Sequence, residues 1–201
     1  MNKILNKLLD KNILNYTFLS ILFLVSLSFI SRFIFLDVRA IHHDESLHGY
    51  YSWLLSNGYG YTHNPLMHGP LNFHLNALSF IFFGDNDFTL RLAPALTGTL
   101  LVVTPFLFRD LIGKRVAIII SIFFLISPIL IYYSRFARND IFIALVSVLL
   151  INQIFNYVLN KNNNSKLIII SILLGLIFCI KEISFITIFI FGSFSLFFSN
   201  F

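Results

Sequence analysis

The chain has 201 residues, of which 57% are hydrophobic and only 11% are charged, and its formal net charge is +5. About a quarter of the residues in a soluble domain are charged, so this composition excludes an ordinary soluble fold and indicates an integral membrane protein. The cations fall mostly in short segments between apolar runs, so we interpret the positive charge as a signal of topology and expect no nucleic-acid partner. The single cysteine, Cys179, excludes a disulfide within the chain.

Long apolar runs predict the architecture, because a membrane-spanning helix needs about 20 mainly apolar residues. In chain order the expected spans are residues 16–36, 91–108, 116–133, 141–159, 167–182 and 183–200, with an outer loop at 37–90. The first run is too long for a typical signal-peptide core, and no small-residue cleavage site follows it, so we expect an uncleaved span. The sequence therefore predicts an all-α, polytopic transmembrane helix bundle of about six spans, forming a single transmembrane domain over residues 1–201.

The distribution of lysine and arginine predicts the orientation in the cell membrane, because cytoplasmic loops are enriched in these residues. A cytoplasmic N-terminus keeps the basic residues of segments 1–11, 109–115 and 160–166 on that side. The loop 37–90 then lies outside, where Arg39 is its only lysine or arginine. The polar segments 134–140 and 181–182 open on the same extracytoplasmic face, so we expect the polar groups of this multi-pass protein to converge there.

The outer loop does not have the composition of a flexible linker. Apolar and aromatic residues recur at helical spacing from Asp44 to Leu55, and again after Pro70 at Phe73, Ala77 and Phe80. We therefore expect two amphipathic helices in this first extracytoplasmic loop, lying along the membrane surface.

Asp44 and Glu45 form an acidic pair beyond the first expected span. Adjacent residues do not share a helix face, so one carboxylate can face a cavity while the other anchors the chain; Asp44 and His48, four residues apart, do share a face. A carboxylate partly shielded from water suits general-base chemistry. The alternative is that the pair only favours the start of a helix through the helix dipole.

A second group of charges lies at Arg135, Arg138 and Asp140, and Lys181 with Glu182 adds a cation on the same expected face. Guanidinium groups bind phosphate through two hydrogen bonds and remain charged, which suits a phosphate held at the level of lipid headgroups. Two arginines on the outer side oppose the usual charge bias, and this favours a functional role. As alternatives, Arg138 pairs with Asp140 or caps the fourth span, and Lys181 pairs with Glu182.

The six histidines raise the question of a metal. Asp44 and His43 are the candidate ligands of a divalent metal ion, but no HExxH or other ligand spacing of known specificity is present. Histidines in loops more often form hydrogen bonds, so we predict no definite cofactor. We interpret five aromatic residues of the outer loop as an interfacial aromatic belt, with a sugar-stacking surface as the alternative: Tyr50, Tyr51, Trp53, Tyr59 and Tyr61.

Several short motifs occur together in one order. They are His43–Tyr51 (HDESLHGYY), Asn64–Pro65, His68–Pro70, Phe83–Asp85, Arg91–Ala95 (RLAPA), Ser127–Pro128, Tyr132–Asp140 (YYSRFARND) and Lys181–Glu182. Over about residues 30–190 the chain resembles membrane glycosyltransferases of the GT-C type, and looks closest to the mannosyltransferase-like group that includes protein O-mannosyltransferases and the lipid A aminoarabinose transferase. Within that group it is similar to the flippase-activity-associated family.

This resemblance implies an outward-facing site beneath the first outer loop and a polyprenyl-phosphate-linked sugar as the donor. It implies that Asp44 activates the acceptor or contributes to a metal site, and that Asp140 is the second acidic residue of the catalytic site. The basic residues of the site would neutralise the donor phosphate as it leaves. The expected substrate-binding residues are Glu45, His48, Arg135, Arg138 and Lys181.

Members of this group usually continue through further spans, whereas this chain stops within an apolar run at Phe201. We therefore expect a truncated or split product, and a second chain that supplies missing spans is a candidate partner.

The leading hypothesis is a glycosyltransferase that moves a sugar from a lipid-linked donor to a glycan, lipid or protein acceptor on the extracytoplasmic side, in contact with membrane lipid. One alternative is a non-catalytic protein that binds lipid-linked sugars or is associated with their flipping; it would need the cations but tolerate loss of Asp44. A small-solute transporter is a third hypothesis, although transporters usually place their polar groups at mid-membrane.

Overall fold

Apolar runs bounded by glycine, proline and polar residues fold as helices in the computed structural model, which describes residues 2–62, 68–159, 164–182 and 184–199. None of these residues lies in a strand, so the all-α prediction is confirmed. The helices in chain order are α1 (Asn2–Phe33), α2 (His43–Ser56), α3 (Leu71–Phe83), α4 (Asp87–Leu90), α5 (Leu92–Val103), the 3₁₀ helix η2 (Thr104–Phe108), α6 (Arg109–Ile112), α7 (Lys114–Ile126), α8 (Pro128–Ser134), α9 (Asp140–Leu159), α10 (Asn164–Ile180) and α11 (Ser184–Ser199).

Glycine and proline set several of the helix ends. Gly84 and Gly113 follow α3 and α6 with φ values of 83° and 82°, a conformation that glycine adopts without strain. Pro128 begins α8 in the first turn, where no backbone N–H is needed, and the side chain of Ser127 caps the same helix. Local sequence therefore decides where these helices begin and end.

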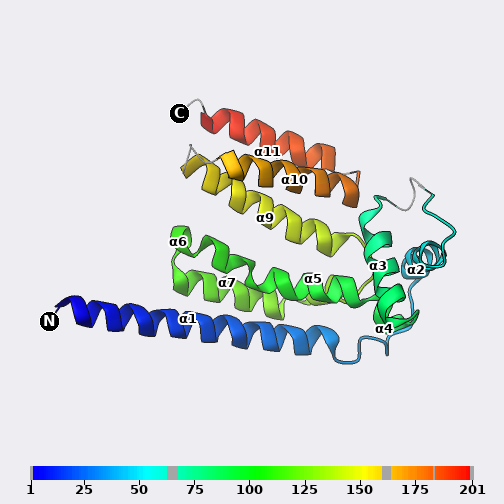
Figure 1. The fold of residues 1–201 in the computed structure, drawn as a ribbon, viewed down its shortest axis with the longest axis horizontal. Coiled ribbons are helices and arrows are strands. Elements are labelled where there is room, and N and C mark those ends of the chain that lie inside the picture. The colour runs from blue at the N-terminus through cyan, green and yellow to red at the C-terminus, as the bar shows by residue number, and fades with distance from the viewer. Residues whose placement is uncertain (1, 63–67, 160–163, 183, 200–201) are drawn as a thin grey trace.

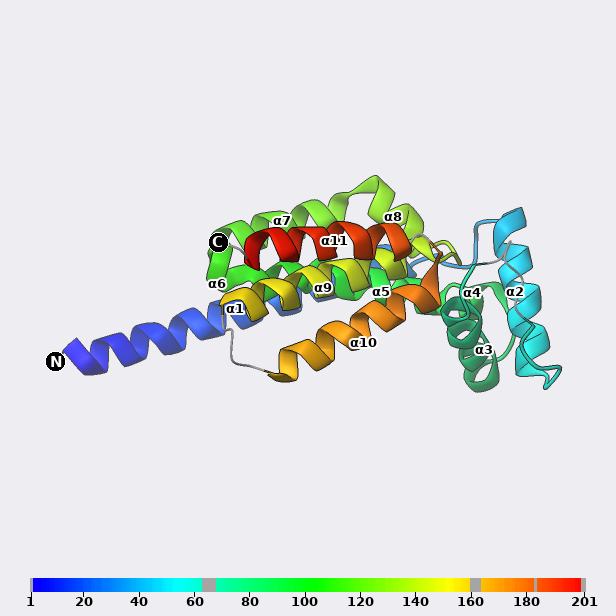
Figure 2. The same ribbon diagram turned by 90° about the horizontal axis from the view of Figure 1, so that it is seen from above.

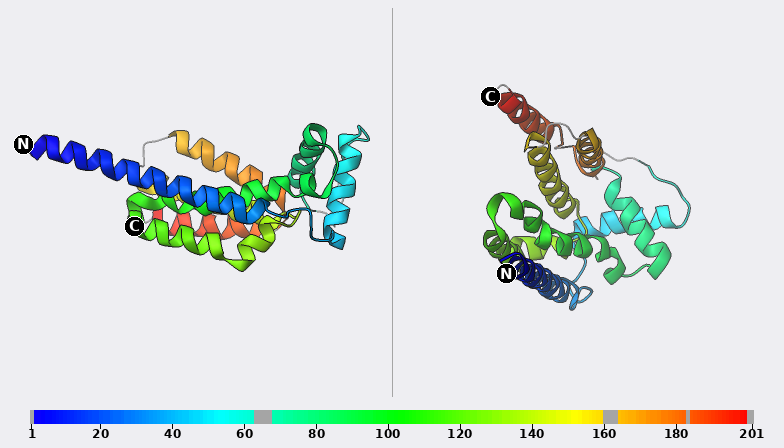
Figure 3. Two further views of the ribbon diagram at one scale, coloured as in Figure 1. Left: turned by 90° about the horizontal axis from the view of Figure 1, so that it is seen from below. Right: turned by 60° about the vertical axis from the view of Figure 1, so that its left-hand side comes forward.

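The longer helices run side by side along one direction, while α2, α3 and α4 lie together at one end of them (Figure 1). We call this end, formed by residues 43–62 and 68–90, the loop end. Seen from above, α2 and α3 cross the direction of the bundle (Figure 2). The N-terminal part of α1 extends beyond the other helices at the opposite end, where α6 also lies (Figure 3).

Among the described residues, three helical stretches are long and apolar enough to cross a membrane. They are Tyr16–Phe33, Leu92–Ile112 and Asp140–Leu159, which lie in the first, second and fourth expected spans. The helices α10 and α11, of 17 and 16 residues, occupy the fifth and sixth positions and are shorter. The chain is a multi-pass membrane protein, and the count of six spans stays a prediction.

The third expected span is not straight, because α7 and α8 meet at an angle of 62°. Pro128 has no N–H, so the carbonyl oxygen of Phe124, four residues earlier, lacks its helical donor. The fully buried side chain of Arg32 in α1 supplies a replacement, since its Nη2 donates to that oxygen at 3.2 Å. The break at Ser127–Pro128 therefore has a local cause and a specific partner on α1.

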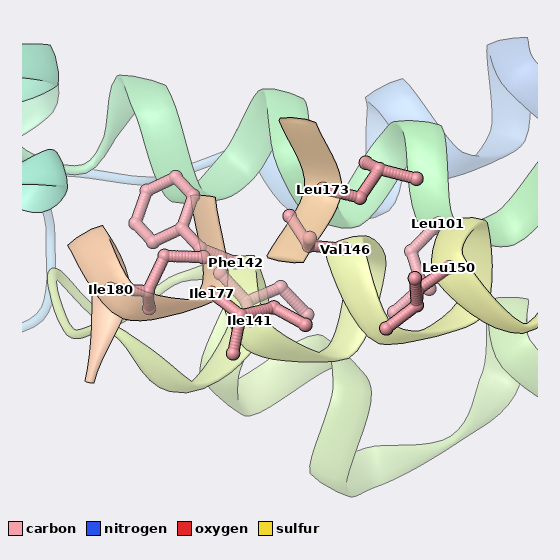
Figure 4. Close-up of a cluster of buried hydrophobic side chains, with 8 residues drawn as sticks. All are labelled: Leu101, Ile141, Phe142, Val146, Leu150, Leu173, Ile177 and Ile180. Carbon is pink, nitrogen blue, oxygen red and sulfur yellow. The ribbon is translucent and has the colours of Figure 1, made fainter. Parts of the chain in front are cut away.

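Helix α5 joins two hydrophobic clusters. Leu101 packs with α9 and α10 in a cluster completed by Ile141, Phe142, Val146, Leu150, Leu173, Ile177 and Ile180 (Figure 4). The next residue, Val102, packs instead with Leu24 of α1, Phe106 of η2 and Ala117 of α7. Neighbouring residues on a helix point about 100° apart, so one short helix holds both halves of the bundle.

The outer surface of the bundle keeps many large apolar side chains exposed, among them Phe23, Phe123 and Phe185. Exposed apolar patches of this extent mark a surface that contacts another apolar phase. This agrees with a bundle whose periphery faces lipid.

The outer loop contains α2 and α3 where helical spacing predicted helices, with α4 directly before the second span. Their placement along a membrane surface stays a prediction. The motif Asn64–Pro65, the start of the polar loop at residues 160–163 and the ends of the sixth expected span, at residues 183 and 200, lie outside the described residues.

Two helical glycines give a matched test of the packing. A methyl group at Gly98 of α5 would overlap the side chain of Ser134, whereas one at Gly175 of α10 would meet no atom within 4 Å. We expect Gly98→Ala to lower the free energy of unfolding by about 1–3 kcal/mol through overpacking. Gly175→Ala should raise it by about 0.5–1 kcal/mol, because alanine favours a helix more than glycine does.

The measurement is thermal unfolding of the two purified variants in detergent, side by side with the unmodified protein. Equal stability of Gly98→Ala and Gly175→Ala would contradict the contact between α5 and α8.

Candidate active site

Glu45 lies at the centre of a buried set of ionic and hydrogen bonds at the loop end. Its side chain and that of Arg91 are both fully buried, and Arg91 donates from Nε to Oε1 at 2.8 Å and from Nη2 to Oε2 at 3.0 Å. Arg39 donates from Nη2 to Oε2 at 2.8 Å. The backbone N–H groups of Ala137 and His42 donate to the two carboxylate oxygens, each at 3.1 Å. Glu45 therefore ties α2 to the start of α5 and to the segment between α8 and α9.

These contacts also set the ionisation of Glu45. Burial is the largest single effect and by itself raises the pKa, but the hydrogen bonds from Arg91, His42 and Ala137, with the charge of Arg91, together outweigh it and hold the pKa of Glu45 below its ordinary value. Arg91 also donates to the backbone carbonyls of Leu36 and Arg39, each at 2.9 Å. The buried pair thereby holds the segment that links α1 to α2.

Asp44, the neighbour of Glu45, points into a different group of charges. Arg138 donates from Nη1 to Asp44 Oδ2 at 2.8 Å, and its Nε lies 3.7 Å from Asp140 Oδ2. Lys181 donates from Nζ to Asp140 Oδ1 at 3.1 Å. The four side chains therefore form a line of alternating charge, Asp44–Arg138–Asp140–Lys181, which we call the charge line.

The charge line is accessible, unlike the Glu45 contacts. The side chains of its members are between 22% and 35% exposed, whereas those of Glu45 and Arg91 are 0% exposed. The line draws on α2, the start of α9 and the residue after α10, which are far apart in the sequence. It therefore offers both carboxylates and cations to a polar molecule at the loop end.

His48 lies on α2, one helical turn after Asp44. Its ring stacks on Phe73 of α3 at 5.3 Å, and Nδ1 lies 2.8 Å from the backbone oxygen of Asp44, to which a protonated Nδ1 donates. Its Nε2 is buried without a hydrogen-bond partner among the described residues. Burial, more than any other effect, lowers the pKa of His48, so the neutral ring is favoured.

Arg135, expected at the donor phosphate, makes structural contacts instead of joining the charge line. Its guanidinium donates to the backbone oxygens of Ser31, Ile34 and Phe35, at 3.1, 2.7 and 2.6 Å. These are carbonyls at the end of α1, where helical donors run out. Arg135 thus caps α1.

A further contact was not anticipated from the sequence. His68 Nδ1 lies 2.8 Å from Glu182 Oε2, next to Lys181. The N–H of the neighbouring Gly69 donates to the backbone oxygen of Ile180 at 3.2 Å, and a side chain at Gly69 would overlap the backbone of Cys179. The close approach of the HGP motif to the end of α10 explains why glycine is needed there.

The metal hypothesis gains no support from the geometry. Within the described ranges, no three or more histidine, cysteine, aspartate or glutamate side chains gather to hold a metal ion. His43 is exposed at the start of α2, beside Asp44.

The comparison with known families decides the assignment. Residues 67–200, about two thirds of the chain, match the model of the dolichyl-phosphate-mannose-protein mannosyltransferase family. The chain belongs to this family. The resemblance to GT-C mannosyltransferase-like proteins is therefore confirmed, and the family is one of membrane glycosyltransferases that use polyprenyl-phosphate sugar donors. No curated protein and no solved structure matches the chain.

The match covers three members of the charge line, Arg138, Asp140 and Lys181, and begins after Asp44. In the sequence, Arg91 stands out only as the first residue of the RLAPA motif. The available signal was an arginine directly before an apolar run, where a charge needs a buried partner.

We predict that Glu45→Gln lowers the free energy of unfolding by about 3 kcal/mol, because it leaves Arg91 buried without a compensating charge. The neighbouring Asp44→Asn breaks a partly exposed pair and should cost less than about 1 kcal/mol. Denaturation of both variants in detergent tests this difference. A loss for Asp44→Asn as large as that for Glu45→Gln would contradict the assignment of Glu45 as the anchor.

The lowered pKa of Glu45 also predicts a dependence of stability on pH. The unfolded state, with a pKa near 4.5, binds the proton more readily than the folded state, so the stabilisation is present above this pH and is lost as the pH falls through the lower folded pKa. The unfolding temperature should therefore decrease more steeply below about pH 4.5 in the unmodified protein than in Glu45→Gln. If the unfolding temperatures of the two proteins fell in parallel as the pH was lowered, Glu45 would not be the source of the pH dependence.

Proposed function

We propose that this protein transfers a sugar from a polyprenyl-phosphate-linked donor to an acceptor hydroxyl at the loop end. The observation that carries the proposal is the charge line, in which Asp44 and Asp140 alternate with Arg138 and Lys181 within hydrogen-bonding or ion-pairing distance. Membership of a glycosyltransferase family supports the same reaction class.

Asp44 is the proposed general base. One carboxylate oxygen, Oδ2, is held by Arg138, while Oδ1 has no hydrogen bond to any residue that the structure describes. The acceptor hydroxyl gives its proton to Asp44 as its oxygen attacks the anomeric carbon of the donor. The bond from that carbon to the phosphate oxygen breaks, and the phosphate leaves with the electron pair.

Arg138 and Lys181 are the proposed partners of the departing phosphate. Arg138 Nη2 makes no hydrogen bond within the described part of the chain, and Lys181 uses one of its three N–H donors on Asp140. Both can therefore donate to phosphate oxygens as negative charge develops there, which is the most effective use of a preorganised cation. Asp140 positions the two cations relative to each other.

Three of the expected substrate-binding residues have a positioning role in this proposal: Glu45, His48 and Arg135. Both oxygens of Glu45 accept hydrogen bonds from arginines and backbone N–H groups, and both Nη atoms of Arg135 donate to backbone oxygens. We therefore assign these two residues to positioning and not to direct contact with the sugar. His48 supports Asp44 from behind.

The same proposal includes the topology expected from the sequence. The basic residues Arg109, Lys114 and Arg115 belong to α6 and α7, and α6 lies at the end opposite to α2 and α3 (Figure 1). This separation supports a single transmembrane domain of about six spans with a cytoplasmic N-terminus and an extracytoplasmic loop end. The acceptor is a glycan, a lipid or a protein, and a second chain that completes the bundle is a candidate partner.

Asp44→Asn should reduce transfer by about 10²–10⁴-fold, because amide nitrogen and oxygen cannot take up the proton. The measurement is sugar transfer from a polyprenyl-phosphate-linked donor by purified protein in lipid vesicles, together with binding of the same donor. Donor binding should remain, since the cations are unchanged.

Asp110→Asn is the matched control, because Asp110 is an exposed acid on α6, away from the loop end, and its loss should leave transfer unchanged. Full transfer by Asp44→Asn would reject the role of Asp44. Donor binding without any transfer by the unmodified protein would favour the alternative, a non-catalytic protein that binds lipid-linked sugars.

Lys181→Met should weaken donor binding by roughly 10-fold or more, because a hydrogen bond to a charged group contributes about 1.5–3 kcal/mol. Lys166→Met, in the first turn of α10, removes a lysine that binds the backbone oxygen of Asn156 and should leave donor affinity unchanged. Equal effects of the two substitutions on the dissociation constant would exclude a specific role for Lys181.

A further inference from the structure

A pocket of about 430 Å³ lies between the end of α1 and the bend of α7 and α8. Its walls are the apolar side chains of Leu36, Ile126, Pro128 and Ile131, with Tyr132 beside them. Two arginines, Arg39 and Arg135, complete the lining. None of the four residues of the charge line borders it, so it is a separate site.

The polar part of this pocket carries an excess of positive charge. Arg39 and Arg91 share one carboxylate, that of Glu45. The guanidinium of Arg135 donates to backbone oxygens and makes no ion pair with any described residue, so two positive charges of this group have no counter-ion. Asp37, the nearest acid in the same turn, is exposed and makes no ion pair with any described residue. An anion in the pocket would compensate this charge.

Arg39 has free capacity to bind such an anion. Its Nη2 donates to Glu45 and to the backbone oxygen of Arg135, at 2.8 and 3.2 Å, but its Nε and Nη1 have no hydrogen-bond partner in the described part of the chain. Its guanidinium lies over the rings of Tyr132 and Phe136, at 5.4 and 5.0 Å, which fixes its orientation. The side chain is 38% exposed, so a ligand can reach it.

The neighbouring positive charges also change the ionisation of Arg135. Burial, and then the positive charges of Arg39 and Arg91, lower its pKa from the ordinary value. A bound phosphate would offset the repulsion between these groups.

The pocket also has the position expected for a lipid. Its arginines follow the candidate span Tyr16–Phe33 and the bent pair that ends at Ser134, so they lie where apolar segments give way to polar ones. The side chains of Ile126, Ile129 and Tyr132 are exposed on α7 and α8. An apolar wall that continues from a cationic end to a lipid-facing surface matches the shape of a phospholipid.

We propose that this pocket binds one anionic membrane phospholipid, with its phosphate between Arg39 and Arg135 and the beginning of an acyl chain along Ile126 and Ile131. A free phosphate would leave the apolar wall unused. The sugar donor fits less well, because no carboxylate lines the pocket to activate an acceptor. The proposal does not rest on the glycosyltransferase reaction.

The test uses the full chain, delipidated in detergent and titrated with phosphatidylglycerol under native mass spectrometry, with phosphatidylcholine, inorganic phosphate and polyprenyl phosphate as comparison ligands. Arg39→Gln removes a cation, and Ile126→Trp fills the pocket without changing any charge. Ile129→Trp is the matched control, because Ile129 is exposed on α8 and does not line the pocket.

We expect one phosphatidylglycerol to bind per chain. Arg39→Gln should bind it about 10-fold more weakly, which corresponds to about 1.4 kcal/mol, and Ile126→Trp should weaken binding to a similar extent. Ile129→Trp should bind it normally, and phosphatidylcholine or inorganic phosphate should bind weakly. Equal binding of the two phospholipids, or unchanged binding in both pocket variants, would overturn the proposal. The proposal would also be overturned if polyprenyl phosphate displaced phosphatidylglycerol from the unmodified protein and bound neither Arg39→Gln nor Ile126→Trp. The pocket would then be assigned to the sugar donor.

Discussion

A carboxylate and a guanidinium that are both withdrawn from water are stable only if each satisfies the other, and the loop end is organised around such a pair. Glu45 and Arg91 join α2, the start of α5 and the α8–α9 segment through contacts that leave no exposed surface on either side chain. With α2 held in this way, Asp44 is presented to Arg138 at a fixed angle.

The consecutive acids Asp44 and Glu45 therefore lie in opposite environments, one partly exposed and one buried. Rotation by about 100° per residue along a helix turns Glu45 into the protein and Asp44 toward the partly exposed charges. The buried acid holds α2 against α5 and the α8–α9 segment, and the accessible acid is the proposed general base. The first turn of α2 carries both acids, and His42 caps this turn. The His42 ring accepts a hydrogen bond from the backbone N–H of Asp44, and the backbone N–H of His42 donates to the side chain of Glu45.

Much of this arrangement could be predicted from the pattern of apolar runs and charged residues along the chain. Apolar run length indicated the helices, and the positions of Asp44, Arg138, Asp140 and Lys181 indicated that polar groups would meet. What could not be predicted was which group each arginine binds. Arg135 and Arg138 look alike in the sequence, but only three-dimensional packing directs one to carbonyl oxygens of α1 and the other to Asp44.

The two arginines that bind backbone oxygens have a mechanical consequence. Arg32 reaches from α1 to Phe124 before the break at Pro128, and Arg135 reaches back to the end of α1 from the far side of α8. Because these two contacts lie on either side of the break, α1 is tied both to α7 and to the residue that follows α8. A change in the 62° angle of the bend would therefore have to stretch or break one of these two contacts.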